Sequence, residues 1–175
     1  GMEAGNVLTD VLFGRVNPSG KLPESMPYCM EDCGAVALGE YPGRPLTEEE
    51  KKHMNAHTTM TYHDGIYVGY RYYEKYNVPV QFCFGHGLSY TTFDYSDVKA
   101  YTLAAKGRSE KSDPLDEVAV ITEVTVTNTG DRTGKEIVQV YVGMKDSKID
   151  RAVKELRGFD KVELAPQESK VVQIP

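Results

Sequence analysis

From Phe93 onward, valines alternate with polar or small residues along the chain. Successive side chains of a β-strand point to opposite faces, so this period of two predicts strands with one buried face. Turn-forming residues separate the expected strands at Asn128–Asp131 and at Ala165–Glu168. We therefore expect antiparallel strands across residues 118–174, packed as a β-sandwich.

The face of each strand that points to the core follows from the polar residues. A shift of one residue would bury Glu123, Thr125 and Gln139 without partners. The residues expected to be buried are Val120, Val124, Val126, Val138, Val140, Val142, Val162 and Leu164. The polar segment Lys106–Asp116, which contains glycine and proline, is expected to be a loop.

The first residues predict a short amphipathic helix from Glu3 that ends at Gly14. Its apolar stripe consists of Val7, Leu8, Val11 and Leu12. No neighbouring segment is available to cover this stripe, and an isolated helix of this length is marginal in water. The sandwich region has about 80 residues, whereas an immunoglobulin-like domain takes about 100. We therefore expect the chain to be part of a longer polypeptide.

Tyrosines are concentrated between residues 62 and 95, which hold eight of the twelve. Tyrosine rings can stack on sugar faces, but we expect these rings to fill core and interfaces. The absence of tryptophan also argues against an autonomous sugar-binding platform. The alternation around Gly69 predicts an extended segment over residues 62–76. Upstream, Thr47–Glu50 is expected to open a short polar helix.

The composition excludes several classes of partner and site. The net charge is −6, so neither nucleic acid nor an anionic membrane is an expected partner. The longest apolar runs fall short of the roughly 18–20 residues of a membrane span. Three cysteines, Cys29, Cys33 and Cys83, are too few for a disulfide framework. Free thiols slightly favour the cytoplasm and leave a periplasmic or secreted location open.

Isolated polar residues give only weak signals for a site. His53 and His57 could share one helix face, but no third metal ligand is placed beside them. His86 is expected to be a structural hydrogen-bonding residue. Ser19 and Ser89 lack the sequence context of a nucleophile. We expect no metal and no cofactor.

Seven segments, in this order along the chain, resemble glycoside hydrolase family 3, which includes many β-glucosidases and related exo-acting glycosidases. These segments are Gly1–Gly14, Asn17–Pro23, Asp64–Tyr73, Phe82–Thr91, Val124–Gly130, Gly134–Val142 and Val153–Phe159. The sequence departs from the family pattern at Asp64, where many members have Glu, and at Cys83, where many have Pro.

The resemblance implies a particular domain organisation. Members of this type have a (β/α)8 barrel, then an α/β sandwich, then a fibronectin type III-like domain. Residues 1–93 would be the C-terminal end of the α/β sandwich with its linker, and residues 94–175 a C-terminally truncated fibronectin type III-like domain. The expected fold class is therefore mainly β.

The resemblance also implies a function for the parent protein. It would be a retaining, exo-acting β-glycosidase, most simply a β-glucosidase, acting on oligosaccharides or β-glucosides. Its nucleophilic Asp and acid/base Glu would lie upstream of Gly1, in the barrel and α/β sandwich of the same chain. No catalytic residue is then expected here, and this chain alone would be inactive. Glu3 is expected to stabilise backbone N–H groups at its helix start. The alternative is a non-catalytic β-sandwich module for binding or interaction.

Overall fold

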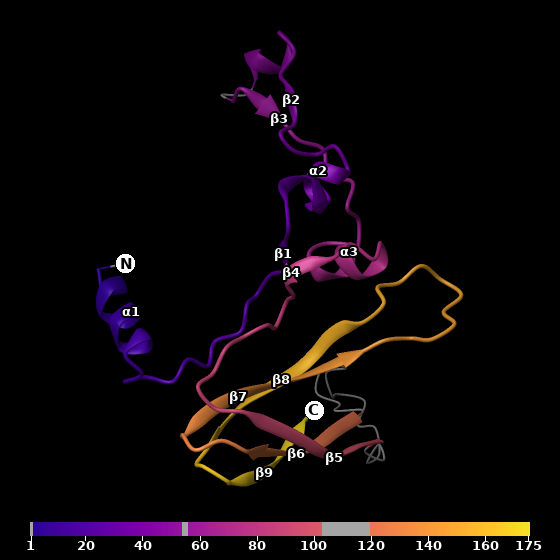
Figure 1. Ribbon diagram of the computed structural model, residues 1–175. Helices are drawn as coiled ribbons and strands as arrows, with labels where there is room; N and C mark the ends of the chain where they lie inside the picture. Colours follow the sequence, from indigo (N-terminus) through magenta and orange to yellow (C-terminus); the bar gives the residue numbers. More distant parts are fainter. Residues whose placement is uncertain (1, 54–55, 103–119) are drawn as a thin grey trace, which may run out of the picture. The chain divides into compact units, whose positions relative to one another are not determined.

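The computed structural model describes residues 2–53, 56–102 and 120–175 (Figure 1). The expected loop Lys106–Asp116 and the start of the first expected strand at Val118 lie outside these ranges. Unit 1 contains residues 1–21, 87–142 and 156–175, and unit 2 contains residues 22–86 and 143–155. Each unit is described separately below.

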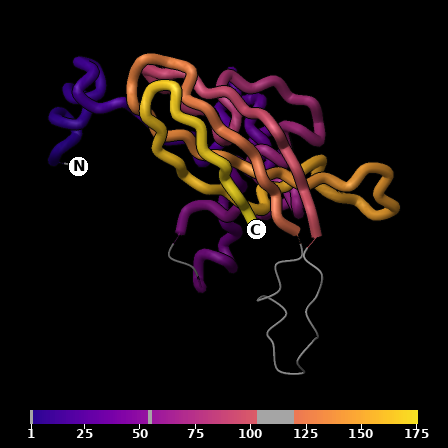
Figure 2. Tube along the Cα trace, turned by 90° about the horizontal axis from the view of Figure 1, so that it is seen from below, coloured from indigo at the N-terminus to yellow at the C-terminus, as the bar shows by residue number. Residues whose placement is uncertain are grey.

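Unit 1 is an antiparallel β-sandwich preceded by one helix, as the sequence predicts. The helix is α1 (Ala4–Leu12). The strands are β5 (Phe93–Thr102), β6 (Val120–Asn128), β7 (Gly134–Val142), β8 (Glu155–Leu164) and β9 (Ser169–Ile174). One sheet has the order β5-β6-β9, with both pairings antiparallel, and the other pairs β7 with β8. Figure 2 shows β5, β6 and β9 running side by side.

The core of unit 1 lies between these two sheets. Its buried residues are Val124, Val126, Val138, Leu164, Val172 and Ile174, with Phe93, Val140 and Val162 half-buried against them. The predicted inward face is therefore correct. The prediction is wrong for Val120 and Val142, which are exposed. Val120 begins β6 and Val142 ends β7, so both stand at strand ends, outside the buried cluster.

A buried amide closes the predicted turn after β6. The side chain of Asn128 has no exposed surface. Its Nδ2 donates to the carbonyl oxygens of Arg132 (2.7 Å) and Leu164 (3.0 Å). Its Oδ1 accepts from the Thr91 hydroxyl (2.6 Å) and the Gly130 N–H (3.1 Å). All four bonds compensate the cost of burying the amide, and they tie the turn to both sheets.

A second amide, that of Asn17, fixes the segment that follows α1. The helix ends at Gly14, whose φ of +70° is the left-handed conformation expected there. Asn17 donates to the carbonyl oxygen of Thr133 (3.0 Å) and accepts from the Ser89 hydroxyl and the Tyr90 N–H. These bonds anchor the segment that starts at Asn17 within unit 1.

Unit 2 has short elements and a small aromatic core. Its strands are β1 (Met26–Pro27), β2 (Arg44–Pro45), β3 (Thr58–Thr59) and β4 (Val80–Phe82), paired antiparallel as β1-β4 and β2-β3. Its helices are the 3₁₀ helices η1 (Met30–Asp32) and η2 (Glu50–Lys52) and the α-helices α2 (Gly34–Ala37) and α3 (Tyr70–Lys75). The expected helical turn near Thr47–Glu50 is therefore confirmed by η2.

The prediction for the tyrosine-rich stretch is wrong in one respect. Residues 62–76 do not form one extended segment, because Tyr70–Lys75 is the helix α3. Gly69, with φ of +62°, turns the chain into this helix, a conformation that glycine adopts without strain. Helical spacing then brings the rings of Tyr72 and Tyr76 to 5.1 Å between centres. Tyr72 and Tyr73 are buried in a cluster with Tyr67, beside Leu38, Val78 and Val80.

Ion pairs join α3 to the loop Gly143–Glu155, which connects β7 with β8. Three acidic and three basic side chains are involved, each partly exposed. The pairs are Lys75–Asp150 at 2.5 Å, Lys154–Glu74 at 2.8 Å and Arg71–Glu155 at 3.4 Å. We call this set the α3 clasp. Pairs at the surface each contribute little to stability, so the clasp depends on its members acting together.

Tyr67 reinforces the α3 clasp. Its hydroxyl donates to the carbonyl oxygen of Arg151 (3.3 Å), and the Lys75 ammonium lies 4.8 Å from the centre of its ring. The hydrogen bond with Lys75 lowers the pKa of Asp150, and the same bond raises the pKa of Lys75. Both shifts favour the charged forms. The clasp therefore holds α3 and Tyr67 in place where they border the cavity described below.

The first prediction concerns the core of unit 1. Val126→Asp should lower the free energy of unfolding by about 3 kcal/mol or more, because Val126 is 0% exposed and the new carboxylate would have no partner. Val171→Asp is the matched control on β9, since Val171 is 58% exposed; it should change stability by less than about 1 kcal/mol. Urea unfolding measures both. Equal losses would contradict the assigned faces.

The second prediction concerns the α3 clasp. Lys75→Glu should lower the melting temperature, and Lys75→Glu combined with Asp150→Lys should restore part of the loss, because the pair is re-formed with reversed charges. Because the folded chain lowers the pKa of Asp150, its contribution is present above the ordinary carboxyl pKa and is lost as the pH falls through the folded value.

The control for the clasp is Lys148→Glu, an equal charge reversal on an exposed lysine of the same loop. It should leave the melting temperature nearly unchanged. A double variant no more stable than Lys75→Glu alone would show that the clasp does not hold the loop.

Candidate functional site

Unit 2 contains an open cavity of about 490 Å³. Three stretches of chain surround it: the segment leading into β1, the region of α2, and residues 62–73. The lining residues are Glu24, Ser25, Met26, Pro27, Cys33, Gly34, Ala35, Glu40, Tyr62, Asp64, Tyr67, Val68, Gly69, Tyr72 and Tyr73. The cavity is therefore built from segments up to about 50 residues apart in sequence.

Tyrosine rings form the buried wall of the cavity. Tyr67, Tyr72 and Tyr73 are all buried, and the rings of Tyr72 and Tyr73 meet edge to face with centres 5.4 Å apart. Burial raises the pKa of Tyr73 to about 12, and the neighbouring Cys33 thiol adds to the shift. The three rings give the cavity an apolar surface.

The carboxylate of Glu40 organises one side of the cavity. Glu40 is only 3% exposed. Its Oε1 accepts hydrogen bonds from the backbone N–H groups of His63 and of Asp64, the latter at 2.9 Å. These donors compensate the burial of a charge, and they fix the turn that carries Tyr62 and Asp64. Sequence analysis missed Glu40, because no local pattern indicates a partner more than 20 residues away.

The rim of the cavity combines hydrogen-bond acceptors with an aromatic ring. Glu24 and Tyr62 are exposed, and Asp64 is half-buried. Within residues 2–53, 56–102 and 120–175, no hydrogen bond or ion pair engages the side chains of these three residues. The Ser25 hydroxyl accepts from the Phe84 N–H (3.0 Å), which leaves its proton available. This arrangement can bind a ligand with both donors and acceptors around an apolar body.

Glu3 and His86, which were considered as candidates from the sequence, make contacts with neighbouring protein groups. Glu3 precedes α1 as expected, but its carboxylate accepts from the Asn6 side chain (2.6 Å), and no side-chain cap bond to the backbone forms. His86 contributes through its backbone, whose carbonyl accepts from the Leu22 N–H (2.8 Å), and through its ring, which lies 5.0 Å from that of Phe82. The expected structural role of His86 is met by these contacts instead of by a side-chain hydrogen bond.

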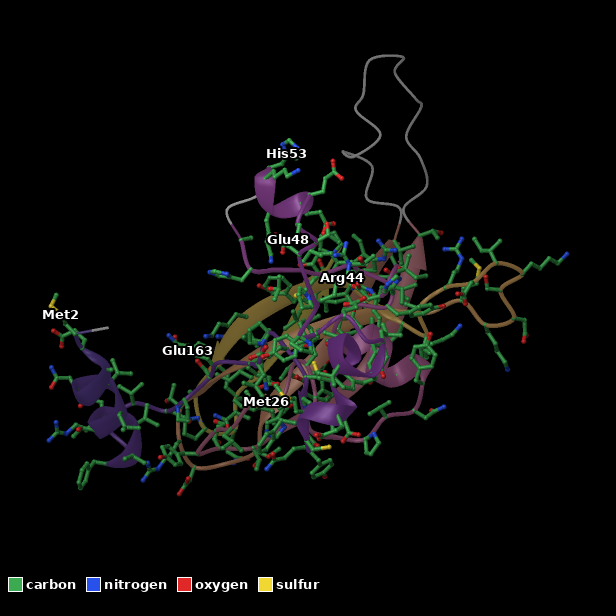
Figure 3. All side chains as sticks on the ribbon, turned by 90° about the horizontal axis from the view of Figure 1, so that it is seen from above. Met2, Met26, Arg44, Glu48, His53 and Glu163 are labelled. Atoms are coloured by element: carbon green, nitrogen blue, oxygen red, sulfur yellow. The ribbon has the colours of Figure 1, made fainter. Side chains whose placement is uncertain are left out.

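The candidate metal ligands are not gathered into one site. His53 and His57 are exposed, and His53 stands with Glu48 at the η2 turn (Figure 3). Across the described ranges, no group of three or more His, Cys, Asp or Glu residues could hold a metal ion. Cys29, Cys33 and Cys83 are free thiols.

The serines also have structural positions. The Ser89 hydroxyl donates to Asn17 Oδ1 (3.0 Å) and accepts from the Thr91 N–H (3.3 Å). Ser19 is half-buried in the segment that follows α1. In the part of the chain that the structure describes, no helix has the length and apolar character of a membrane span.

Curated relatives match nearly the whole chain. A probable β-glucosidase I of Aspergillus clavatus is 43% identical over 175 residues, which is 99% of this chain and 18% of that protein. β-Glucosidase B of Emericella nidulans is 45% identical over 177 aligned residues, which is 99% of this chain and 19% of that protein. The chain thus spans slightly less than one fifth of the length of these relatives.

Solved structures give the same result. A β-glucosidase from Streptomyces venezuelae in complex with D-glucose is 36% identical, with a TM-score of 0.75 over 95% of this chain and 19% of that one. β-Glucosidase 3B from Thermotoga neapolitana in complex with glucose is 38% identical, with a TM-score of 0.76 over 99% of this chain and 21% of that one.

Two domain families match the sequence. Residues 136–175 match the fibronectin type III-like domain, and residues 1–90 match the glycosyl hydrolase family 3 C-terminal domain. The resemblance seen in the sequence motifs is therefore confirmed: the chain belongs to glycoside hydrolase family 3 and corresponds to the C-terminal portion of its members.

Proposed function

We propose that this chain is the C-terminal scaffold of a retaining, exo-acting β-glucosidase that releases terminal non-reducing β-D-glucosyl residues. The nucleophilic Asp and the acid/base Glu come from polypeptide outside residues 1–175, in a barrel and an α/β sandwich of the same chain. The main support is the similarity to β-glucosidases, which extends over 99% of this chain and so includes both units. A similarity this extended favours the enzyme over an independent β-sandwich module.

The ionisation of the described carboxyl groups supports the scaffold role. Retaining glycosidases use two carboxyl groups about 5–5.5 Å apart, and the acid/base group has a raised pKa. Among the described carboxyl groups, three have a pKa that departs clearly from the ordinary value, and in each case the pKa is lowered. These groups are Glu50, Asp150 and Glu168. A lowered pKa stabilises the carboxylate, which is the opposite of what a proton donor needs.

The clearest case is Glu50. Both Arg44 terminal nitrogens bond its carboxylate, at 2.9 and 2.7 Å, and the Thr47 N–H and hydroxyl donate to it as well. The Arg44 bond is the largest cause that holds the pKa of Glu50 at about 2. Glu50 is therefore a structural anion that fixes the η2 turn to β2.

Within this function we propose a division of the chain near residue 93. Residues 1–93 belong to the end of the α/β sandwich and its linker, and residues 94–175 to the fibronectin type III-like domain. The matches to residues 1–90 and 136–175 support this division. Strands β6 to β9 and all of β5 except its first residue, Phe93, lie on the C-terminal side of it.

The third prediction tests the scaffold role. The 175-residue chain should hydrolyse p-nitrophenyl β-D-glucoside and a panel of other aryl glycosides no faster than buffer, because we propose that the nucleophile and the acid/base group both lie outside it. Release of p-nitrophenol is followed by its absorbance, and circular dichroism establishes that the chain is folded. A full-length family 3 β-glucosidase is the positive control.

Variants of the cavity carboxylates make this assay decisive. Turnover above background that is lost in Glu24→Gln or Asp64→Asn would place catalysis in this chain and refute the proposal. Turnover that survives both changes and co-purifies with the chain would also refute the proposal, whereas turnover that separates from the chain on purification comes from a contaminating enzyme.

A further inference from the structure

We propose that the cavity of unit 2 is a binding pocket for a pyranose-sized polyhydroxylated ligand, such as a glucoside. Tyr62 is the ring on which the sugar stacks, and Glu24 and Asp64 accept hydrogen bonds from its hydroxyl groups. This goes beyond the scaffold function, because it gives the chain a ligand of its own and requires no catalytic group.

The size and wall of the cavity suit such a ligand. Its volume of about 490 Å³ lies within the roughly 300–1,000 Å³ of small-molecule pockets, which are mainly apolar with a few placed polar groups. The buried rings of Tyr67, Tyr72 and Tyr73 supply the apolar wall. The C–H faces of a pyranose can pack on such a surface.

The exposure of Tyr62 is the observation that distinguishes it from the other tyrosines of the cavity. It is 78% exposed, so its ring has no packing role in unit 2, yet it lines the cavity. An aromatic side chain with a polar end is well suited to a contact that is apolar on one side and wet on the other. Tyr62 thus offers a ring face at the cavity rim.

The polar groups of the rim are free to bind a ligand. The carboxylates of Glu24 and Asp64 have no hydrogen-bond or ion-pair partner among the described residues, and both line the cavity. The turn carrying Asp64 is held by the buried carboxylate of Glu40, so Asp64 is presented on a fixed backbone. This preorganisation lowers the entropic cost of binding.

The mixture of groups favours a sugar over an organic cation. Tyrosine rings with carboxylates could also enclose an ammonium group, but a cation needs acceptors only. Here the hydroxyls of Tyr62 and Ser25 add donors to the carboxylate acceptors. Sugar hydroxyls both donate and accept, so they use the whole set.

This inference departs from the expectation drawn from the sequence. Sequence analysis assigns the tyrosines to packing, and Tyr67, Tyr72 and Tyr73 do pack. Tyr62 does not, and the carboxylates beside it come from distant parts of the chain. Their proximity could not be read from the tyrosine-rich segment alone.

The fourth prediction is direct binding of methyl β-D-glucoside to the 175-residue chain. Titration calorimetry, with amide chemical-shift changes by NMR, should show saturable binding to one site per chain. Tyr62→Ala should weaken binding about five-fold or more, and Asp64→Asn should weaken it in the same direction. Because Tyr62 is 78% exposed, its replacement should leave the fold intact, which the NMR spectrum checks.

The matched control is Tyr28→Ala. Tyr28 is also exposed, at 66%, and belongs to unit 2, but it does not line the cavity; its variant should bind as the unchanged chain does. Binding that is equally weakened by Tyr28→Ala would overturn the proposal. So would the absence of saturation at glucoside concentrations of tens of millimolar, or binding of tetramethylammonium in place of the glucoside. None of these outcomes depends on hydrolysis, so they are separate from a failure of the scaffold function.

Discussion

The side chain of Asn128 is the interaction on which unit 1 most depends. One fully buried amide makes four hydrogen bonds, to Thr91, Gly130, Arg132 and Leu164. Leu164 ends β8 and Asn128 ends β6, so the amide joins the two sheets at one end of the sandwich. The valine core supplies most of the burial, but it is non-directional. The amide adds direction, since any other arrangement of these strands would leave buried polar atoms without partners.

Unit 2 uses a buried carboxylate in a comparable way. Glu40 holds the turn at His63 and Asp64 through backbone N–H groups, while the α3 clasp holds α3 and the neighbouring Tyr67. The hydrogen bonds of Glu40 are expected to stabilise unit 2 more than the ion pairs of the α3 clasp, because Glu40 is buried and the clasp is partly exposed. Glu40, Asp64 and Tyr67 all line the tyrosine-walled cavity. Asp64 is thus positioned through its backbone, which leaves its own carboxylate available for the ligand binding proposed above.

The sequence predicts unit 1 well and unit 2 poorly, for a physical reason. Valine alternation and turn residues are local signals, and they place the inward face of β6 through β8 correctly except at Val120 and Val142. In unit 2 the structure depends on long-range contacts. Glu40 meets Asp64, and Lys75 meets Asp150; no spacing rule connects such pairs. The alternation around Gly69 predicts an extended segment where the structure has the helix α3. The helix buries Tyr72 and Tyr73 together in the aromatic core, which the local alternation does not indicate.

We propose that this chain is part of a glycoside hydrolase whose catalytic carboxylates lie outside residues 1–175, and this proposal can be tested directly. A retaining glycosidase forms a covalent glycosyl–enzyme intermediate, which a 2-deoxy-2-fluoroglucoside traps. The direct measurement uses the full-length polypeptide that contains residues 1–175. After trapping, peptide mass mapping identifies the residue that carries the fluorosugar. The account predicts that the fluorosugar is attached to an aspartate outside these residues. Attachment to any carboxylate within residues 1–175 would contradict it.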